Sequence, residues 1–432
     1  MPVVRARFRV GFPPGWRIAP NRGIARVFCL LAVLIAGMLS AVASAQETTV
    51  TLLSDRSTLS ATPASSPRIA ASENGDCTVT WQKTLVPGVE SRIAVRRRVN
   101  GGWTEEEELV SPNGARLARQ PVVQHDSSGN PHVVWVGEKD GRTYLEYAFH
   151  MNLGSPAWSY FPGLASSTNK IEFPSIAFGP RNQVFIVWQE REGTLSRIHA
   201  FVFDDAGETH HEILDGGDKA HCIVYPGLIA IPPEIVGHED RMAAYWFDLD
   251  DAEPRVTVQF WDSENDEWES LSSPPWPKKI VEVLPFVFSS SEAGLFLVGH
   301  QSVGRFDRVF LCSTEGEVDY LDQPAPVWDR FPVLSQPGSD DRWGVIWQQE
   351  GREGTSLVQA LLRPSVFLNG GKNGIVSHPL ARVDSFLAPE PDVAVSNNSL
   401  LSVWIGWRGL DAASDNDIPS VLFSETELTQ LQ

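Results

Sequence analysis

The sequence predicts an all-β fold made of repeated four-stranded antiparallel units, and two observations carry this prediction. First, one phrase recurs along the chain: a proline opens an apolar strand, a polar turn follows, and a second strand ends in tryptophan. Second, the chain has 15 Trp against 6 Tyr, so tryptophan is used systematically. Self-similarity with a period of about 50 residues indicates a repeat architecture.

The phrase occurs in seven copies, and six of them end the second strand with tryptophan. The residues in this column are Trp81, Trp135, Trp188, Trp246, His300, Trp347 and Trp404. The copies span about residues 66–117, 118–170, 171–225, 226–281, 282–328, 329–387 and 388–432, the last together with 46–56.

Each copy also contains further strands. In the second copy they are expected at 121–125, 131–136, 143–150 and 157–163. β-Branched and aromatic residues alternate in these stretches, and Gly, Asn, Asp and Ser interrupt them, which is the pattern of strands and turns. Four antiparallel strands in about 50 residues are typical of a propeller blade, so the sequence predicts a seven-bladed β-propeller.

The seventh copy is one strand short, with strands expected only at 391–396, 400–405 and 420–426. An extra strand, residues 46–55, precedes the first copy. Pairing of this strand with the last copy closes the ring and leaves no open sheet edge. The sequence thus predicts one domain over residues 46–432, and we expect a monomer.

The first 45 residues have the pattern of a secretory signal peptide. They contain six arginines and no acidic residue, and an apolar run ends at Ala43-Ser44-Ala45. The run is shorter than the ~20 residues of a membrane span, so we expect cleavage after Ala45 rather than retention as an anchor. The mature protein is expected to be periplasmic or secreted, with no membrane span.

Charge and cysteine content restrict the function further. Without residues 1–45, the chain has 29 Lys and Arg against 54 Asp and Glu, a net charge of −25. Such a surface repels phosphate backbones, which disfavours nucleic-acid binding. The three remaining cysteines, Cys77, Cys222 and Cys312, lie in or beside apolar runs, so buried free thiols are favoured over disulfides.

The tryptophan column is interpreted as structural. A large aromatic side chain on the second strand buries about 150–250 Å² between neighbouring blades. An active site is normally unique, whereas this residue repeats at equivalent positions. His300 breaks the column and is either a ligand or base, or a packing histidine, which is the favoured reading.

Candidate ligand-binding residues follow from the order of strands in a blade. The chain enters the first strand and leaves the second on the same face, so residues near each proline and after each tryptophan should surround the mouth of the channel. Polar residues there suit a carbohydrate or protein ligand; the alternative is solvated loops with local salt bridges. The candidates are Arg119, Glu138, Glu172, Glu190, Asp248, Gln301, Arg330, Gln348 and Glu390, with Gln82, Gln120 and Glu350 beside them.

The repeat over residues 66–405 resembles that of secreted bacterial BNR-repeat, sialidase-like propellers. The phrase closest to their Asp box (Ser-x-Asp-x-Gly-x-Thr-Trp) is 263–268, which lacks the Asp and Gly positions. Arg68-Ile69 is not followed by the proline of their Arg-Ile-Pro motif, and no arginine triad or nucleophilic tyrosine matches. The resemblance implies a propeller, and as alternative activity a glycoside hydrolase or lyase using Glu138, Glu172 or Glu190.

The favoured function is a non-catalytic binding or scaffolding module, because the loops are near-equivalent and no unique catalytic set occurs. No cofactor is predicted. His210 and His211 with His221 suggest a metal only weakly, because adjacent residues on a strand point to opposite faces. Residues 248–254 and 411–419 carry carboxylates that calcium favours, but neither has the pattern of an EF-hand loop.

Overall fold

The computed structural model describes residues 50–54, 64–151, 157–179, 182–204, 207, 209–215, 223–231, 241–248, 255–263, 265–270, 287–291, 294–303, 306–313, 318–321, 328–335, 342–351, 354–362, 376–383, 390–396, 399–406 and 420–427. Contacts divide the chain into Met1–Glu47 and Thr48–Gln432, and all described residues belong to the second unit. The expected signal peptide lies outside the described residues.

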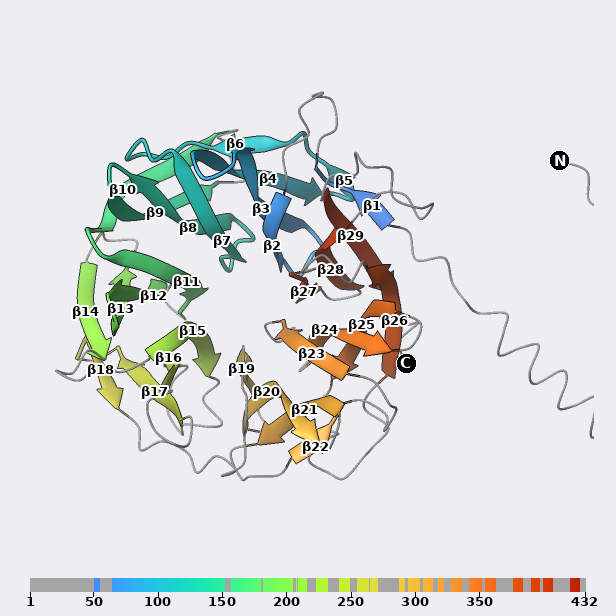
Figure 1. The fold of residues 1–432 in the computed structure, drawn as a ribbon. Coiled ribbons are helices and arrows are strands. Elements are labelled where there is room, and N and C mark those ends of the chain that lie inside the picture. Colours follow the sequence, from blue (N-terminus) through green and yellow to red (C-terminus); the bar gives the residue numbers. More distant parts are fainter. Residues whose placement is uncertain are drawn as a thin grey trace, which may run out of the picture. The chain divides into compact units, whose positions relative to one another are not determined.

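The described strands form seven antiparallel sheets, which are numbered here in the order of the sequence copies (Figure 1). Sheet 1 contains β2 (Ala64–Ala71), β3 (Cys77–Val86), β4 (Glu90–Val99), β5 (Gly102–Trp103) and β6 (Glu107–Leu109). Sheet 2 contains β7 (Leu117–His125), β8 (Pro131–Lys139), β9 (Arg142–His150) and β10 (Trp158–Ser167). Sheet 3 contains β11 (Lys170–Phe178), β12 (Val184–Glu192), β13 (Leu195–Phe203) and β14 (Thr209–Asp215).

The other four sheets follow the same plan. Sheet 4 contains β15 (Ile223–Ile231), β16 (Arg241–Asp248), β17 (Arg255–Asp262) and β18 (Glu267–Ser270). Sheet 5 contains β19 (Val287–Ser291), β20 (Gly294–Val303), β21 (Phe306–Ser313) and β22 (Val318–Tyr320). Sheet 6 contains β23 (Trp328–Leu334), β24 (Trp343–Gly351), β25 (Gly354–Leu362) and β26 (Val376–Val383). Sheet 7 contains β27 (Asp392–Val395), β28 (Ser399–Gly406) and β29 (Ser420–Glu427), with β1 (Val50–Leu52) paired to β29.

The prediction of an all-β fold with four-stranded antiparallel sheets is confirmed, with one local difference. The fourth position of sheet 1, within residues 102–110, is split into β5 and β6, which both pair with β4. Between them Thr104 turns toward Arg97, whose backbone N–H donates to the threonine Oγ1 at 3.0 Å. Glu106 turns inward to an ion pair of 2.8 Å with Lys83. These contacts replace the strand pairing of this stretch.

Neighbouring sheets contact each other through their first strands. Contacts join β2 to β7, β7 to β11, β11 to β15, β15 to β19, β19 to β23, β23 to β27, and β27 to β2. The apolar core lies between the sheets, because each hydrophobic cluster combines residues of two neighbours. Sheets 1, 2, 3, 6 and 7 are therefore covered on both faces by apolar residues of neighbouring sheets.

The repeated tryptophans lie in these cores. All six are about 1% exposed, and each packs on the sheet that precedes its own. Trp135 of sheet 2, for example, belongs to a cluster with Ile93 and Val95 of sheet 1. Trp188 of sheet 3 packs with Leu145 and Tyr147 of sheet 2. Burial of such a large apolar side chain stabilises the contact between sheets.

Two of the three cysteines expected to be buried thiols lie within the described residues, and both are buried and outside any disulfide. Burial raises the pKa of the Cys77 thiol to about 12. It raises the pKa of Cys312 to about 11. Thiols with such values carry almost no thiolate at neutral pH and are poor nucleophiles. Within the described part of the chain, no helix has the length and apolar character needed to cross a membrane.

Candidate functional site

The proline that opens each repeat lies at an irregularity in the first strand. In sheets 1, 2, 3, 4 and 6 the pairing register of the first strand shifts at this proline. Proline has no N–H to donate, so it fits where the ladder is interrupted. The residue before it adopts a positive φ at Ser66 (51°), Gln120 (52°), Phe173 (51°) and Glu390 (40°). The positive-φ conformation costs a residue other than glycine about 1–2 kcal/mol. Because the fold accepts this cost at four equivalent positions, the bulge is part of the repeated architecture.

The side chains at these bulges link neighbouring first strands. The backbone N–H of Phe173 donates to Oε1 of Gln120 in the preceding sheet, at 3.0 Å. The N–H of Ser66 donates to Oε2 of Glu390 at 2.5 Å. Sheet 7 therefore contacts sheet 1 in the same way that sheet 2 contacts sheet 3. One oxygen of the candidate Glu390 is used in this contact.

One candidate forms a diagonal charge pair between the first and second strands of its sheet. In sheet 3, Arg191 donates to Glu172, with a nitrogen to oxygen distance of 3.1 Å. The same register positions hold Arg119 and Glu138 in sheet 2, and Arg330 and Glu350 in sheet 6, with the charges exchanged. For Glu172 the structure therefore agrees with the alternative expected from the sequence, a local salt bridge in place of a ligand contact.

Arg119 differs from the arginine of sheet 3, because its guanidinium is not paired. Its Nε and Nη2 atoms are buried, and no described residue accepts a hydrogen bond from them. The residue lies on β7, immediately before the bulge at Gln120. Burial of N–H groups without an acceptor costs about 1–3 kcal/mol for each group, and more when the group is charged.

Glu190 holds the loop that leads into sheet 3. Its Oε1 accepts hydrogen bonds from Ser167 Oγ at 3.0 Å and from Asn169 Nδ2 at 2.7 Å. Its other oxygen lies 3.6 Å from Nε2 of His199. His199 in turn lies flat against Trp188, with ring centroids 5.2 Å apart, and its Nδ1 is 3.2 Å from Nε2 of His211. The carboxylate is thus engaged by the end of sheet 2, by the connection into sheet 3 and by a histidine of its own sheet.

The structure adds a carboxylate that the sequence analysis missed, Glu146 on β9. It is 0% exposed, and its Oε1 accepts hydrogen bonds from Ser111 Oγ at 2.5 Å and from Asn113 Nδ2 at 3.4 Å. Burial raises its pKa, against the lowering effect of these hydrogen bonds. Glu146 therefore holds the loop into sheet 2 as Glu190 holds the loop into sheet 3. The shared Ser-x-Asn of the two loops is the sequence signal for this pair.

Gly137 makes room for Glu146, and replacing it with alanine is expected to destabilise the protein. Gly137 occupies the position that Glu190 has in sheet 3, two residues after the tryptophan. An added Cβ would lie 2.8 Å from Ala115 Cβ and 3.0 Å from Glu146 Cδ. We expect Gly137→Ala to lower the unfolding free energy by about 1–3 kcal/mol, measured by urea denaturation. Gly102→Ala is the control, because its nearest atom is 3.7 Å away; equal losses in both variants would contradict this explanation.

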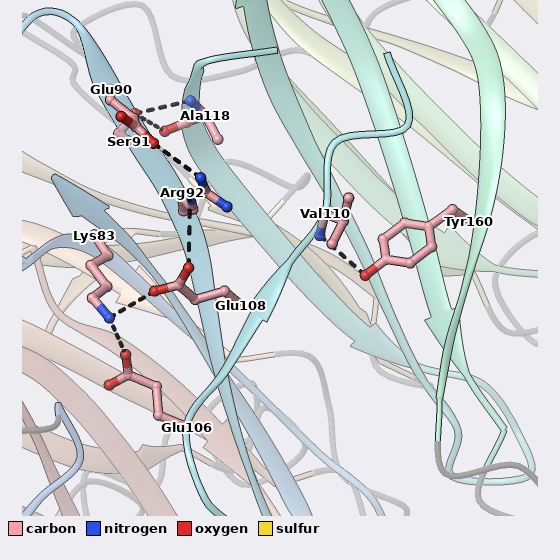
Figure 2. A network of polar contacts seen from close by, with 9 residues as sticks. All are labelled: Lys83, Glu90, Ser91, Arg92, Glu106, Glu108, Val110, Ala118 and Tyr160. Atoms are coloured by element: carbon pink, nitrogen blue, oxygen red, sulfur yellow. Dashed lines mark hydrogen bonds and ion pairs between the residues drawn. The ribbon is translucent and has the colours of Figure 1, made fainter. Parts of the chain in front are cut away.

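A second repeated contact braces the first strand of the next sheet. Ser91 Oγ donates to the carbonyl of Ala118 at 2.7 Å and accepts from its N–H at 2.9 Å (Figure 2). Thr143 Oγ1 makes the equivalent contacts with Asn169 and Ile171 one sheet later. Figure 2 also shows Lys83 between Glu106 and Glu108, both at 2.8 Å. These polar groups support the strand ends and are not free for a ligand.

For the other candidates the structure gives the position on a strand. Glu138 and Gln348 are half-buried near the ends of β8 and β24. The backbones of Asp248, Gln301, Arg330 and His300 lie on β16, β20 and β23, and their side chains are outside the described set. His210 contacts Trp261, whereas His211 contacts Trp188, so the two lie on opposite faces. The described residues contain no group of three metal ligands, and they include neither His221 nor 249–254 and 411–419.

Comparison with known proteins gives structural neighbours only. No protein-family model and no curated protein matches the chain. The polysaccharide lyase Uly1 superposes with a TM-score of 0.50 and 11% identity over 89% of this chain and 94% of its own. A protein of unknown function from Dyadobacter fermentans has a TM-score of 0.47 and 9% identity, covering 88% and 97%. The GH93 α-L-arabinofuranosidase of Fusarium graminearum has a TM-score of 0.45 and 11% identity, covering 88% and 98%.

The superposition on Uly1, together with the repeated four-stranded sheets, decides the architecture. The chain has a β-propeller fold. At these identities the likeness shows the fold of this propeller and leaves its activity to the site itself.

Proposed function

We propose that the protein is an exported, seven-bladed β-propeller that binds a carbohydrate or protein ligand at the loop end of its first strands, without catalysis. The observation that carries this proposal is the half-buried Arg119, whose Nε and Nη2 atoms are buried without an acceptor among the described residues. A ligand oxygen at that place would satisfy the N–H groups that are otherwise left unpaired. Export follows from the signal-peptide pattern of residues 1–45.

The blade count and the closure of the ring rest on the contacts between sheets. Seven first strands contact one another in sequence order, and β27 contacts β2. The bond from Ser66 to Glu390 repeats the geometry found between sheets 2 and 3. In this arrangement β1 supplies the strand that the seventh copy lacks. The seven sheets are then the blades, and the bulges surround the channel mouth.

Two of the three acids named for a glycosidase or lyase, Glu172 and Glu190, support a non-catalytic role. Glu172 is paired with Arg191, and Glu190 accepts from Ser167 and Asn169. A glycosidase needs one acid and one base or nucleophile on either side of the scissile bond, free to transfer protons. Carboxylates held in place by neighbouring side chains serve the strand ends instead.

The test is binding of the chain from Thr48 to an array of immobilised oligosaccharides with pyranosyl, furanosyl and sialyl ends, together with a fluorogenic glycoside assay. We expect binding without turnover. Arg119→Leu should weaken binding by about 10- to 100-fold, the effect of losing a charged hydrogen bond of about 1.5–3 kcal/mol.

Arg142→Leu is the matched control, since Arg142 is exposed on the same sheet and contacts only Ser166 in the described residues. Equal binding by the Arg119 and Arg142 variants would remove the proposed site. Turnover that disappears in Glu172→Gln or Glu190→Gln would replace the binding role with a catalytic one.

A further inference from the structure

We propose that His199 and His211 form a binding site for a divalent transition-metal ion, Cu²⁺ in preference to Zn²⁺, on the outer strands of sheet 3. His199 lies on β13 and His211 on β14, the edge strand of this sheet (Figure 1). Their facing nitrogens, Nδ1 of His199 and Nε2 of His211, are 3.2 Å apart. The pair lies on other strands than the bulge in β11, so the proposal goes beyond the binding function proposed above and does not depend on it.

The separation of the two nitrogens suits a shared metal ion. Imidazole nitrogens bind Zn²⁺ at about 2.0–2.1 Å, so two of them on one ion lie about 3–4 Å apart, for angles at the ion between a right angle and a straight line. In the metal-free chain the same two atoms are within reach of one N–H···N hydrogen bond. The ion takes the place of that proton, and a tilt of the exposed His211 ring brings both lone pairs onto it.

Glu190 determines which nitrogen of His199 is available. Its Oε2 lies 3.6 Å from Nε2 of His199, and a carboxylate there favours the tautomer with the proton on Nε2. The lone pair is then on Nδ1, the atom that faces His211. A carboxylate behind a histidine in this way orients the ring and makes it a stronger metal ligand. Burial lowers the pKa of both imidazoles, so both are neutral at pH 7, as metal binding requires.

Trp188 holds both rings in position. Its indole ring is parallel to them within 12°, with centroid distances of 5.2 Å to His199 and 5.5 Å to His211. Trp188 is 1% exposed and belongs to the core between sheets 2 and 3. His199 is buried, whereas His211 is exposed. The pair is therefore fixed on its inner side and open to an ion and to water on its outer side.

The pair is specific to sheet 3, which favours a function over a repeated packing role. His199 lies opposite Trp188 in the pairing of the second and third strands. In sheet 2 this position holds Glu146, which supports the preceding loop; in sheet 3 Glu190 makes the corresponding contacts, so the position is free for a histidine. The residues at this position in the other sheets are Ala94, Glu146, Thr257, Val309, Val358 and Leu422. None of them is a histidine.

Two imidazoles define the kind of ion and the affinity. Nitrogen ligands select late transition metals and bind Cu²⁺ more tightly than Zn²⁺, whereas Ca²⁺ takes oxygen ligands. The described residues contain no group of three metal ligands, so water completes the coordination shell on the open side. Half the ligand set of a structural zinc site corresponds to a Kd of about 1–200 µM.

The test is isothermal titration calorimetry of CuCl₂, ZnCl₂ and CaCl₂ into the chain from Thr48, freed of metal with EDTA and dialysed into buffer without chelator. We expect one site per chain, tighter for Cu²⁺ than for Zn²⁺, and no binding of Ca²⁺. Electron paramagnetic resonance of the Cu²⁺ complex should show coupling to two imidazole nitrogens. His211→Phe should weaken Cu²⁺ binding by at least about tenfold, the loss that follows removal even of groups that only orient a metal ligand.

His210→Phe is the matched control, because the His210 ring contacts Trp261 on the other face of the same strand. His199→Phe should lose the site as His211→Phe does; if it does not fold, the exposed His211 decides alone. Equal Cu²⁺ affinity in wild type and His211→Phe, a Kd above about 1 mM, or coupling to a single nitrogen would overturn the proposal and leave the two histidines as a hydrogen-bonded pair. The array experiment depends on Arg119, so these outcomes leave the proposed function to its own test.

Discussion

A chain that begins at residue 55, and so lacks β1, is expected to melt about 5–10 °C below the chain that begins at Thr48. The strand pairs with β29, and Leu53 beside it is 0% exposed. The N–H of Leu53 donates to the carbonyl of Val421, and the carbonyl of Leu53 accepts from Arg96 of sheet 1. Removal therefore exposes an apolar core, leaves β29 as an open edge and breaks a link between two sheets. Losses of several kcal/mol in a domain of this size give a shift of this order.

The measurement is thermal unfolding followed by circular dichroism, with a peptide of residues 48–54 added back to the shortened chain. We expect the peptide to restore part of the lost stability, because it refills a preformed strand position. If the shortened chain does not fold, Leu53→Ala in the longer chain should still lower the unfolding free energy by about 2–5 kcal/mol. An unchanged melting temperature in both variants would mean that β1 does not complete sheet 7.

The repeated sheets were predictable because their signal is periodic. Tryptophan at the end of the second strand and proline at the start of the first recur at similar spacing, and each copy reinforces the next. The split of the fourth strand in sheet 1 was not predictable, because its cause is tertiary. The run at 104–110 alternates poorly, and Lys83, some 20 residues earlier in the sequence, decides which glutamates turn inward.

The candidate site was predicted in part, since polar residues near each proline were chosen and aromatic ones were not. Gln120 and Glu390 lie at the bulges, and Phe173 has the same backbone conformation but was not among the polar candidates. Glu146 was missed because it lies within the apolar strand 143–150, where alternation suggests packing. Its loop-holding role becomes visible only when Gly137 and the Ser-x-Asn loop are seen around it.

Acidification from pH 6.5 to 4 is expected to destabilise the fold through buried histidines. Burial lowers the pKa of His125 and of His199 to about 4, although Asp126 and Glu190 beside them act in the opposite direction. An unfolded histidine titrates near 6.5, so between these values the unfolded chain binds more protons and stability falls as the pH falls. A shift of this size corresponds to at most about 3 kcal/mol for His125, and to less for His199, whose partner His211 is exposed.

Carboxylates also change the stability between pH 6.5 and 4, some raising it and others lowering it as the pH falls. A histidine variant is therefore needed to isolate the histidine effect. Burial raises the pKa of Glu146 and Asp392, which favours folding as the pH falls. Hydrogen bonds outweigh burial and lower the pKa of Asp126 to about 2, which adds a loss only below pH 4. His199→Phe keeps the stacking on Trp188 and removes the titrating group. Urea midpoints from pH 7.5 to 4.5 should therefore fall less steeply in His199→Phe than in wild type. The control His210→Phe, on the opposite face of β14, should follow the wild-type curve. Parallel curves for all three proteins would mean that the pKa of His199 is the same in the folded and the unfolded chain.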